Sequence, residues 1–161
     1  MTSRDSDADI PRLLRAYLDA EYRWARDGEW PTLAIGHAAP ELEAAFPDAG
    51  VFGLLSAWNP HSVERPEDTN RAADAALHQA LRNSGAHFLP GISSARNRSW
   101  REPSWVTVDL PLQQLDALSR RFGQLGTLYC HRGAAFRLRM YADRPAGADD
   151  SLPIDWMTAS G

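Results

Sequence analysis

Hydrophobic side chains recur at helical spacing in three stretches of the chain. Each stretch begins near an aspartate or a proline and ends near a glycine, residue types that favour the start and the end of a helix. In the second stretch, Leu77 and Leu81 belong to the stripe that we expect to be buried. The three predicted helices run over about residues 10–27, from Pro66 to Gly85, and from Asp109 as a cap to Gly123.

Strand-like segments lie between these helices. VFGLLSAW is apolar on both faces, which predicts a central strand of the sheet. GTLYCH and AFRLRMY are joined by Arg132 and Gly133, and this spacing predicts a hairpin with a two-residue connection. The six predicted strands read TLAIGH, VFGLLSAW, HFLPGI, SWVTVDL, GTLYCH and AFRLRMY, and PELEAAF is a candidate for a short helix between the first two.

Paired strands alternate with single helices along the chain, which favours the α+β class. We predict a single domain with a mainly antiparallel sheet of about six strands and three helices packed mostly on one face. The domain is expected to cover residues 10–141. Residues 1–9 are expected to form a disordered tail, and residues 142–161 a flexible acidic tail whose IDWM segment can dock back onto the domain.

Alternation along the strands separates aliphatic side chains from aromatic and charged ones. Val106 and Val108 point to one face of their strand, because successive side chains alternate. Cys130 falls with the aliphatic set, where an inert thiol is expected. The opposite face presents Trp105, Tyr129, His131, Arg137, Arg139 and Tyr141. An open face of this kind suits single-stranded nucleic acid, and the alternatives are a solvated face, a face covered by the C-terminal segment, and a dimer interface.

Charge is distributed unevenly along the chain. The net charge is −4, and all 17 basic residues are arginine. Residues 1–81 carry 7 arginines against 14 acidic residues, residues 82–144 carry 10 against 4, and residues 145–161 carry 3 aspartates. A basic segment between acidic ends indicates an anionic partner, although acidic helices packed on basic strands give the same distribution.

Several protein classes lack support in the sequence. The single cysteine provides neither an internal disulfide nor a paired-thiol motif. His61 and Glu64 alone do not make a metal site, and there is no glycine-rich phosphate loop or catalytic-triad signature, so we expect no metal and no cofactor. No apolar run is long enough to span a membrane and the N-terminus lacks a secretory pattern, so we expect a cytoplasmic protein without membrane contact.

Two asparagines occupy positions that need a physical reason. Asn59 follows the apolar strand VFGLLSAW, and Asn70 falls on the buried stripe of the second predicted helix. A buried amide must find hydrogen-bond partners. Either the two side chains brace the connection HSVERPEDT, which we favour, or one of them orients a ligand at the strand end.

Four motifs follow one another: LLSAWNPHS, Asn70 near a helix start, WREPSW before a strand, and RRFGQLGTLYC. Their order resembles a bacterial family known as domain of unknown function 3293. That family is similar in having Asn-Pro after an apolar strand, an Asn in the next helix, a Glu-x-Ser motif opening a strand, and Phe-Gly-Gln before another strand. The resemblance covers about residues 50–140. It implies no activity and directs attention to Asn59, Pro60, Asn70, Glu102, Ser104 and Gln124.

Three functions remain open at this point, and the sequence does not decide whether the protein is an enzyme. The preferred function is a binding or regulatory module for a nucleotide or a nucleic acid. The second is a small enzyme with Glu102 as general base next to Ser104 and Gln124. The third is a structural protein whose aromatic sheet face forms a homodimer. The ligand-binding candidates are Asn59, Asn70, Arg96, Arg98, Arg101, Gln124, Tyr129, Arg137 and Arg139.

Overall fold

The computed structural model describes residues 3–95 and 101–158, with side chains from residue 10 onward. These residues form four α-helices, one short 3-10 helix and eight strands. The helices are α1 (Ser3–Asp19), α2 (Pro40–Ala45), η1 (Pro60–Ser62), α3 (Glu67–Ser84) and α4 (Leu112–Arg121). The strands are β1 (Glu21–Trp24), β2 (Thr32–Leu33), β3 (Val51–Leu55), β4 (His87–Ser94), β5 (Arg101–Val108), β6 (Gly126–His131), β7 (Arg137–Met140) and β8 (Ile154–Trp156).

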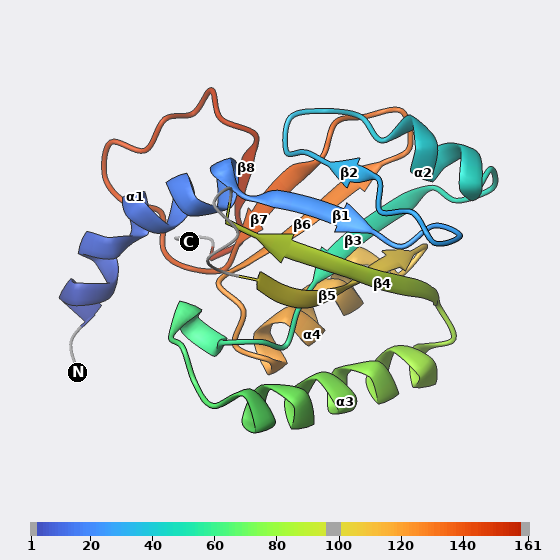
Figure 1. Ribbon diagram of the computed structural model, residues 1–161. Coiled ribbons are helices and arrows are strands. Elements are labelled where there is room, and N and C mark those ends of the chain that lie inside the picture. Colours follow the sequence, from blue (N-terminus) through green and yellow to red (C-terminus); the bar gives the residue numbers. More distant parts are fainter. Residues whose placement is uncertain (1–2, 96–100, 159–161) are drawn as a thin grey trace.

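The eight strands form one sheet that curls into a half-barrel (Figure 1). Their order is β2-β1-β4-β5-β3-β6-β7-β8, and neighbours are antiparallel except for the parallel pair of β7 and β8. After β2, the chain turns back to β7, where the Gly36 N–H donates to the Phe136 carbonyl at 2.8 Å. The α+β class and the mainly antiparallel sheet are therefore confirmed, whereas the strand number was underestimated.

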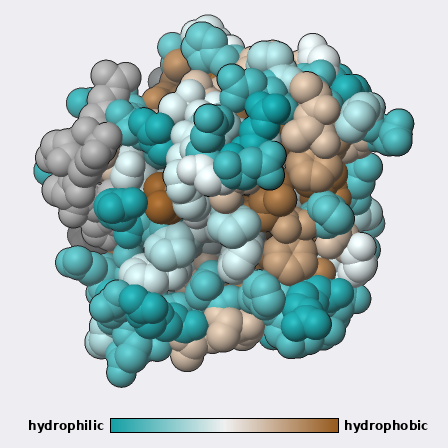
Figure 2. All heavy atoms as spheres, turned by 45° about the vertical axis from the view of Figure 1, so that its right-hand side comes forward, coloured by the Kyte–Doolittle hydropathy of each residue, from teal (hydrophilic) through white to brown (hydrophobic). Residues whose placement is uncertain are grey.

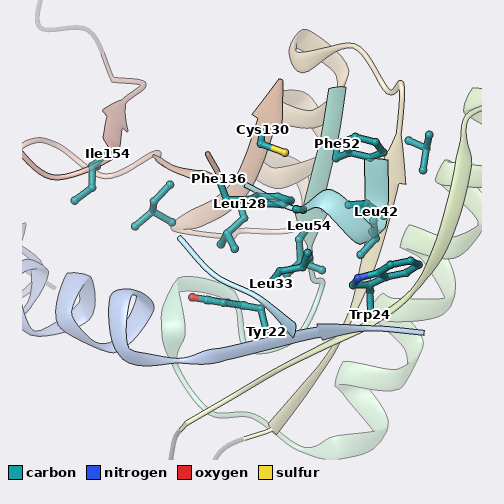
Figure 3. Packing of buried hydrophobic residues seen from close by; sticks show 14 of the residues in the cluster. Tyr22, Trp24, Leu33, Leu42, Phe52, Leu54, Leu128, Cys130, Phe136 and Ile154 are labelled. Atoms are coloured by element: carbon teal, nitrogen blue, oxygen red, sulfur yellow. The ribbon is translucent and has the colours of Figure 1, made fainter. Parts of the chain in front are cut away.

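The sheet is covered on both faces, each by its own hydrophobic cluster. The inner cluster fills the half-barrel and includes Tyr22, Trp24, Leu33, Leu42, Phe52, Leu54, Leu128, Cys130, Phe136 and Ile154 (Figure 3). The outer cluster lies between the sheet and helices α3 and α4 and includes Leu55, Ala57, Leu77, Leu81, Leu110, Leu115 and Tyr129. The prediction that helices pack mostly on one face is wrong. The curled sheet leaves one side of the inner cluster open. Leu14 of α1 and Leu42 of α2 cover that side.

The predicted alternation of the strands is confirmed, but the aromatic face is not open. Val106 and Cys130 belong to the inner cluster, while Tyr129 belongs to the outer cluster and Trp105 packs against it. Helices α3 and α4 therefore lie over the face that was expected to be exposed. Trp105 is held there by a hydrogen bond from its indole N–H to Asp74 of α3 at 2.8 Å. This face therefore lacks the open surface that a nucleic-acid platform or a dimer interface would need.

The first predicted helix is wrong in its second half. Helix α1 ends at Asp19, and Tyr22 and Trp24 are the buried positions of strand β1. Trp24 lies seven residues after Tyr17, so its position also fits a helical repeat. Strand β1 has only four residues, so its alternation of buried and half-buried side chains is too short to be distinguished from the helical repeat.

Both expected tails contain regular structure. Helix α1 begins at Ser3, within the segment expected to be a disordered tail. Near the other end, Ile154–Trp156 form β8, and the Leu138 N–H of β7 donates to the Pro153 carbonyl at 2.9 Å. The apolar Ile154 gives this segment a reason to dock, because its side chain joins the inner cluster.

Two turn predictions are also corrected. Asp109 does not cap α4, because its φ of 58° turns its carboxylate toward β3, where it accepts hydrogen bonds from the backbone N–H groups of Gly50 at 2.7 Å and Val51 at 3.2 Å. Strand β6 ends at His131 and β7 begins at Arg137, so five residues, 132–136, separate the two strands. The connection is therefore longer than the predicted two-residue turn.

Candidate functional site

The connection after β3 has an unusual backbone. Asn59, His61 and Ser62 have φ values of 47°, 58° and 59°, in the left-handed region that non-glycine residues seldom adopt. Asparagine tolerates this region better than most residues, but His61 and Ser62 carry a conformational cost of about 1 kcal/mol or more each. Such a conformation persists only where the surrounding structure enforces it.

A pair of amide side chains supplies that enforcement. Asn70, in the first turn of α3, is buried, with 1% of its surface exposed. Its Oδ1 accepts from the Asn59 backbone N–H at 2.9 Å, and its Nδ2 donates to the Asn59 Oδ1 at 2.8 Å. Arg65 joins the pair by donating from Nε to the Asn70 Oδ1 at 2.6 Å and from Nη2 to the Ala57 carbonyl at 3.0 Å. These bonds agree with the favoured interpretation that the two asparagines brace the connection.

The same pair of amides reaches the start of β5. The Asn59 Nδ2 donates to the Glu102 Oε1 at 3.0 Å. Glu102 is half-buried, and the buried Ser104 donates from Oγ to the Glu102 backbone carbonyl at 3.3 Å. The Ser104 hydroxyl is thus directed at a backbone carbonyl of its own strand. Glu102 is thus fixed by an amide donor at the edge of the connection.

Gln124 approaches this connection from the segment between α4 and β6. Its Nε2 donates to the Trp58 carbonyl at 3.1 Å, and the His61 N–H donates to the Gly123 carbonyl at 2.7 Å. A side chain is excluded at Gly123, since its φ is 67° and a Cβ there would lie 2.8 Å from the Pro60 Cβ. Four sequence candidates, Asn59, Asn70, Glu102 and Gln124, therefore meet around one connection, and we call them, together with Ser104 and Arg65, the polar site.

Sequence reasoning missed one neighbour of the polar site, Tyr17 of α1. Burial raises the pKa of Tyr17, and the negative charge of Glu102 raises it further, while hydrogen bonding from Ser62 and from the Gly126 backbone acts in the opposite direction. The Tyr22 hydroxyl donates to the Tyr17 carbonyl at 2.5 Å and fixes the end of the helix. A tyrosine on a buried stripe needs a partner for its hydroxyl, and this was the signal available in the sequence.

The candidates on β6 and β7 belong to a second network. Arg139 forms a two-pronged ion pair with Asp116 of α4, at 2.8 and 2.6 Å, and the Tyr141 hydroxyl donates to the same carboxylate at 2.7 Å. Arg137 and Tyr129 both donate to Asp155 of β8. Both arginines thus already have carboxylate partners within the chain.

The pKa values of the two carboxylates reflect this pairing. Burial would raise the pKa of Asp116, but the hydrogen bonds from Arg139 and Tyr141 outweigh it, so the pKa lies below the usual range. The pKa of Asp155 is lowered in the same way, since hydrogen bonds from Arg137 and Tyr129 outweigh its burial. Each carboxylate is therefore charged at neutral pH and holds its arginine in place.

The remaining cationic candidates lie on or near the β4–β5 connection. Arg101 is exposed at the start of β5, paired with Ser94 of β4. Arg96 and Arg98 lie outside the described residues. Arg101 precedes Glu102, so alternation directs the two side chains to opposite faces of β5.

Two cavities lie away from the polar site. One of about 630 Å³ is lined by residues 45–49, 84–87 and 108–111 and by Gln114, near His87 at the other end of the β4–β5 pair from Glu102. The other, of about 250 Å³, lies between α1 and residues 145–149. Figure 2 shows the face at the α2 end of the molecule, which is mostly hydrophilic with hydrophobic residues gathered on its right-hand side.

Residues 3–95 and 101–158 contain neither a metal-binding cluster nor a membrane-spanning helix. No group of three or more His, Cys, Asp or Glu side chains is arranged to hold a metal ion within these ranges. In the same part of the chain, no helix combines the length and the hydrophobicity that crossing a membrane requires. The buried indole N–H groups of Trp24 and Trp58 have no hydrogen-bond partner among the described residues.

Comparison with known proteins identifies one family. Residues 55–126 match the family described as "Protein of unknown function (DUF3293)", which confirms the resemblance drawn from the motif order. No curated protein and no solved structure matches the chain. Asn59, Asn70, Glu102, Ser104 and Gln124 all lie inside the matched segment, and Tyr17 lies outside it.

Proposed function

We propose that this chain, through its DUF3293 segment, is a binding module for a small anionic ligand of the nucleotide class, held at the polar site. The observation that carries the proposal is the connection 59–62, which is left-handed at residues 59, 61 and 62 and is locked by the buried Asn59–Asn70 pair against Glu102. Backbone strain enforced by a buried hydrogen-bond network is typical of binding sites, where the strain serves to position side chains. Asn59 and Asn70 act as positioning residues, and Glu102 provides a contact to the ligand.

The charge distribution supports an anionic group on the ligand. Residues 82–144 carry 10 arginines against 4 acidic residues, and three of these arginines, at positions 96, 98 and 101, fall within six residues of sequence that end at the first residue of β5. Arginine binds phosphate through paired donors, which a carboxylate such as Glu102 cannot do. A nucleotide combines a phosphate for the arginines with a polar base for Glu102. A single nucleotide is favoured over a long nucleic acid, because α3 and α4 cover the aromatic face of the sheet.

The test is a thermal-shift titration of the whole chain with nucleoside mono-, di- and triphosphates and short single strands at low salt. A ligand that binds only the folded state raises Tm by mass action. We expect at least one nucleotide to raise Tm, and both Glu102→Gln and the double variant Arg96→Ala with Arg98→Ala to reduce that rise. Arg71→Ala is the matched control, since Arg71 forms an exposed ion pair with Glu67 on α3 at 2.8 Å. If no nucleotide raises Tm, the proposal fails.

An enzyme with Glu102 as general base is the second candidate. The hydrogen bond from the Asn59 Nδ2 favours it, because the bond orients the carboxylate. Turnover of a bound nucleotide that Glu102→Gln abolishes without loss of binding would support this function. Full turnover by the folded Glu102→Gln variant would remove Glu102 from any catalytic role.

A further inference from the structure

The larger of the two cavities lies far from the polar site along the β4–β5 pair. His87 and Val108 pair with each other at the cavity, whereas Glu102 lies at the other end of the same two strands. The volume of the cavity, about 630 Å³, falls within the range of about 300 to 1,000 Å³ that is usual for ligand pockets. Three chain segments meet there at the right-hand side of Figure 1, beside α2 and the end of α3: residues 45–49, 84–87 and 108–111.

The cavity has an apolar floor and an aromatic pair. The rings of Phe46 and His87 both line it, and they meet edge to face with their centroids 5.6 Å apart. An apolar group that enters the cavity is removed from water, which favours binding. The floor consists of lining side chains that are buried and apolar: Ala49, Val108 and Leu110.

Two carboxylates line the cavity at its exposed rim. Asp48 is exposed and has no hydrogen bond or ion pair among the described residues. Asp109 accepts through Oδ1 from the backbone N–H groups of Gly50 and Val51, at 2.7 and 3.2 Å. Its Oδ2 has no partner in the part of the chain that the structure describes. Since Gly50 follows Asp48 by two residues, both carboxylates lie on the same part of the rim.

The groups around these carboxylates leave the cavity with a negative charge. Within the described part of the chain, no arginine lines it. Ser84, the last residue of α3, does line it, and the carbonyl end of a helix favours a cation. Helix α4 contributes its N-cap, Pro111, which has no N–H to offer an anion. Arg132 comes near, but its Nη1 donates to the Phe46 and Ala49 carbonyls at 3.0 and 3.1 Å.

We propose that this cavity binds a small organic cation, a primary ammonium group carried on an apolar body. The ammonium group donates to Asp48 and Asp109, and charge-assisted hydrogen bonds of this kind are stronger than neutral ones. The apolar body lies on the buried floor, and the Phe46 ring attracts a nearby cation. Phosphates and carboxylates are repelled here. The site therefore takes a class of ligand different from the nucleotide proposed for the polar site.

The experiment is an NMR titration of the full chain at low salt with butylamine and phenethylamine, and with butanol and butyrate as ligands of similar size. It is run at about pH 8, where histidine in water is uncharged and an alkylamine is charged. Both amines, at millimolar concentrations, should shift the backbone amide signals of residues 45–49, 84–87 and 108–111, whereas the alcohol and the acid should not. Added salt should weaken amine binding, because it screens exposed charges.

Two variants remove the charges and keep an oxygen acceptor. Asp109→Asn retains an Oδ1 for the two N–H groups, and asparagine tolerates the φ of 58° at this position. Asp48→Asn alters a side chain that has no hydrogen bond to lose among the described residues. Each should weaken amine binding about two- to fivefold, the effect of one exposed charge pair. Glu41→Gln is the control and should leave binding unchanged, since it removes an exposed carboxylate of α2 that does not line the cavity.

Circular dichroism should show that the variants remain folded, and if Asp109→Asn unfolds the chain, Asp48→Asn alone decides. The inference is overturned if neither amine shifts the three segments, if butanol shifts them equally, or if the folded Asp→Asn variants bind the amines as well as the wild type does. No nucleotide takes part in this titration. Its failure therefore leaves the proposed function standing, and a failure of nucleotide binding leaves this inference standing.

Discussion

Replacing Asn70 by alanine removes the centre of the hydrogen-bond network that holds residues 57–65. Asn70 is 1% exposed, so water does not take the place of its amide. The variant loses bonds to the Asn59 N–H at 2.9 Å, to the Asn59 Oδ1 at 2.8 Å and to the Arg65 Nε at 2.6 Å. Two neutral bonds contribute about 1 kcal/mol each and the charged one somewhat more, so the free energy of unfolding should fall by about 3 kcal/mol.

This loss is large against a typical stability of about 5 to 15 kcal/mol, and it is measured by urea denaturation with linear extrapolation. Asn83→Ala is the matched control, because Asn83 is an exposed asparagine on the same helix whose Oδ1 accepts from Gln79 at 3.0 Å. We expect the control to change the free energy of unfolding by less than about 0.5 kcal/mol. A loss below about 1 kcal/mol in Asn70→Ala would show that the network does not enforce the connection.

Three further predictions concern other parts of the fold. Burial raises the pKa of the Cys130 thiol to about 12, so a thiol reagent at pH 8 should leave the native protein unmodified and react once urea unfolds it. Asp116→Asn should lower the free energy of unfolding by about 3 kcal/mol at pH 7 by leaving the buried arginine partner unpaired. The folded pKa of Asp116 lies below its unfolded value of about 4. The stabilisation that Asp116 contributes is therefore present above about pH 4 and is lost as the pH falls through the folded pKa. The urea midpoint should consequently drop less between pH 7 and pH 2 in the variant than in the wild type. Gly123→Ala should lower the free energy of unfolding by about 2 kcal/mol, more than Gly133→Ala does. Both glycines have positive φ, but only at position 123 would a Cβ lie 2.8 Å from the Pro60 Cβ. Urea midpoints of the two variants measure the difference.

Much of the polar site followed from the sequence. Asn59 after an apolar strand and Asn70 on a buried stripe each required a hydrogen-bond partner, and they became partners of each other. Glu102 followed from its motif, and its bond to the Asn59 Nδ2 joined it to the pair. Tyr17 was missed because its spacing fits an ordinary core position, which tells nothing about the partner of its hydroxyl.

The arginines of β7 show where the sequence was insufficient. Arg137 and Arg139 looked like a cationic surface, because strand alternation places them on the same face. Their carboxylate partners, Asp155 and Asp116, come from β8 and α4, and no local pattern indicates these pairings. In the same way, no local pattern predicts the curl of the sheet that brings Phe136 beside residue 36. The sequence therefore did not indicate that helices are needed on both faces of the sheet.

The central claim is that the polar site binds the ligand, and mapping backbone amide chemical shifts during a nucleotide titration tests it most directly. The chain has a mass of 17.9 kDa, within reach of solution NMR. We predict that the largest changes fall at residues 59–65, 102–104 and 124, with a smaller group around Tyr17. Changes confined to residues 45–49 and 84–87, which line the 630 Å³ cavity, or no changes at all, would contradict the claim.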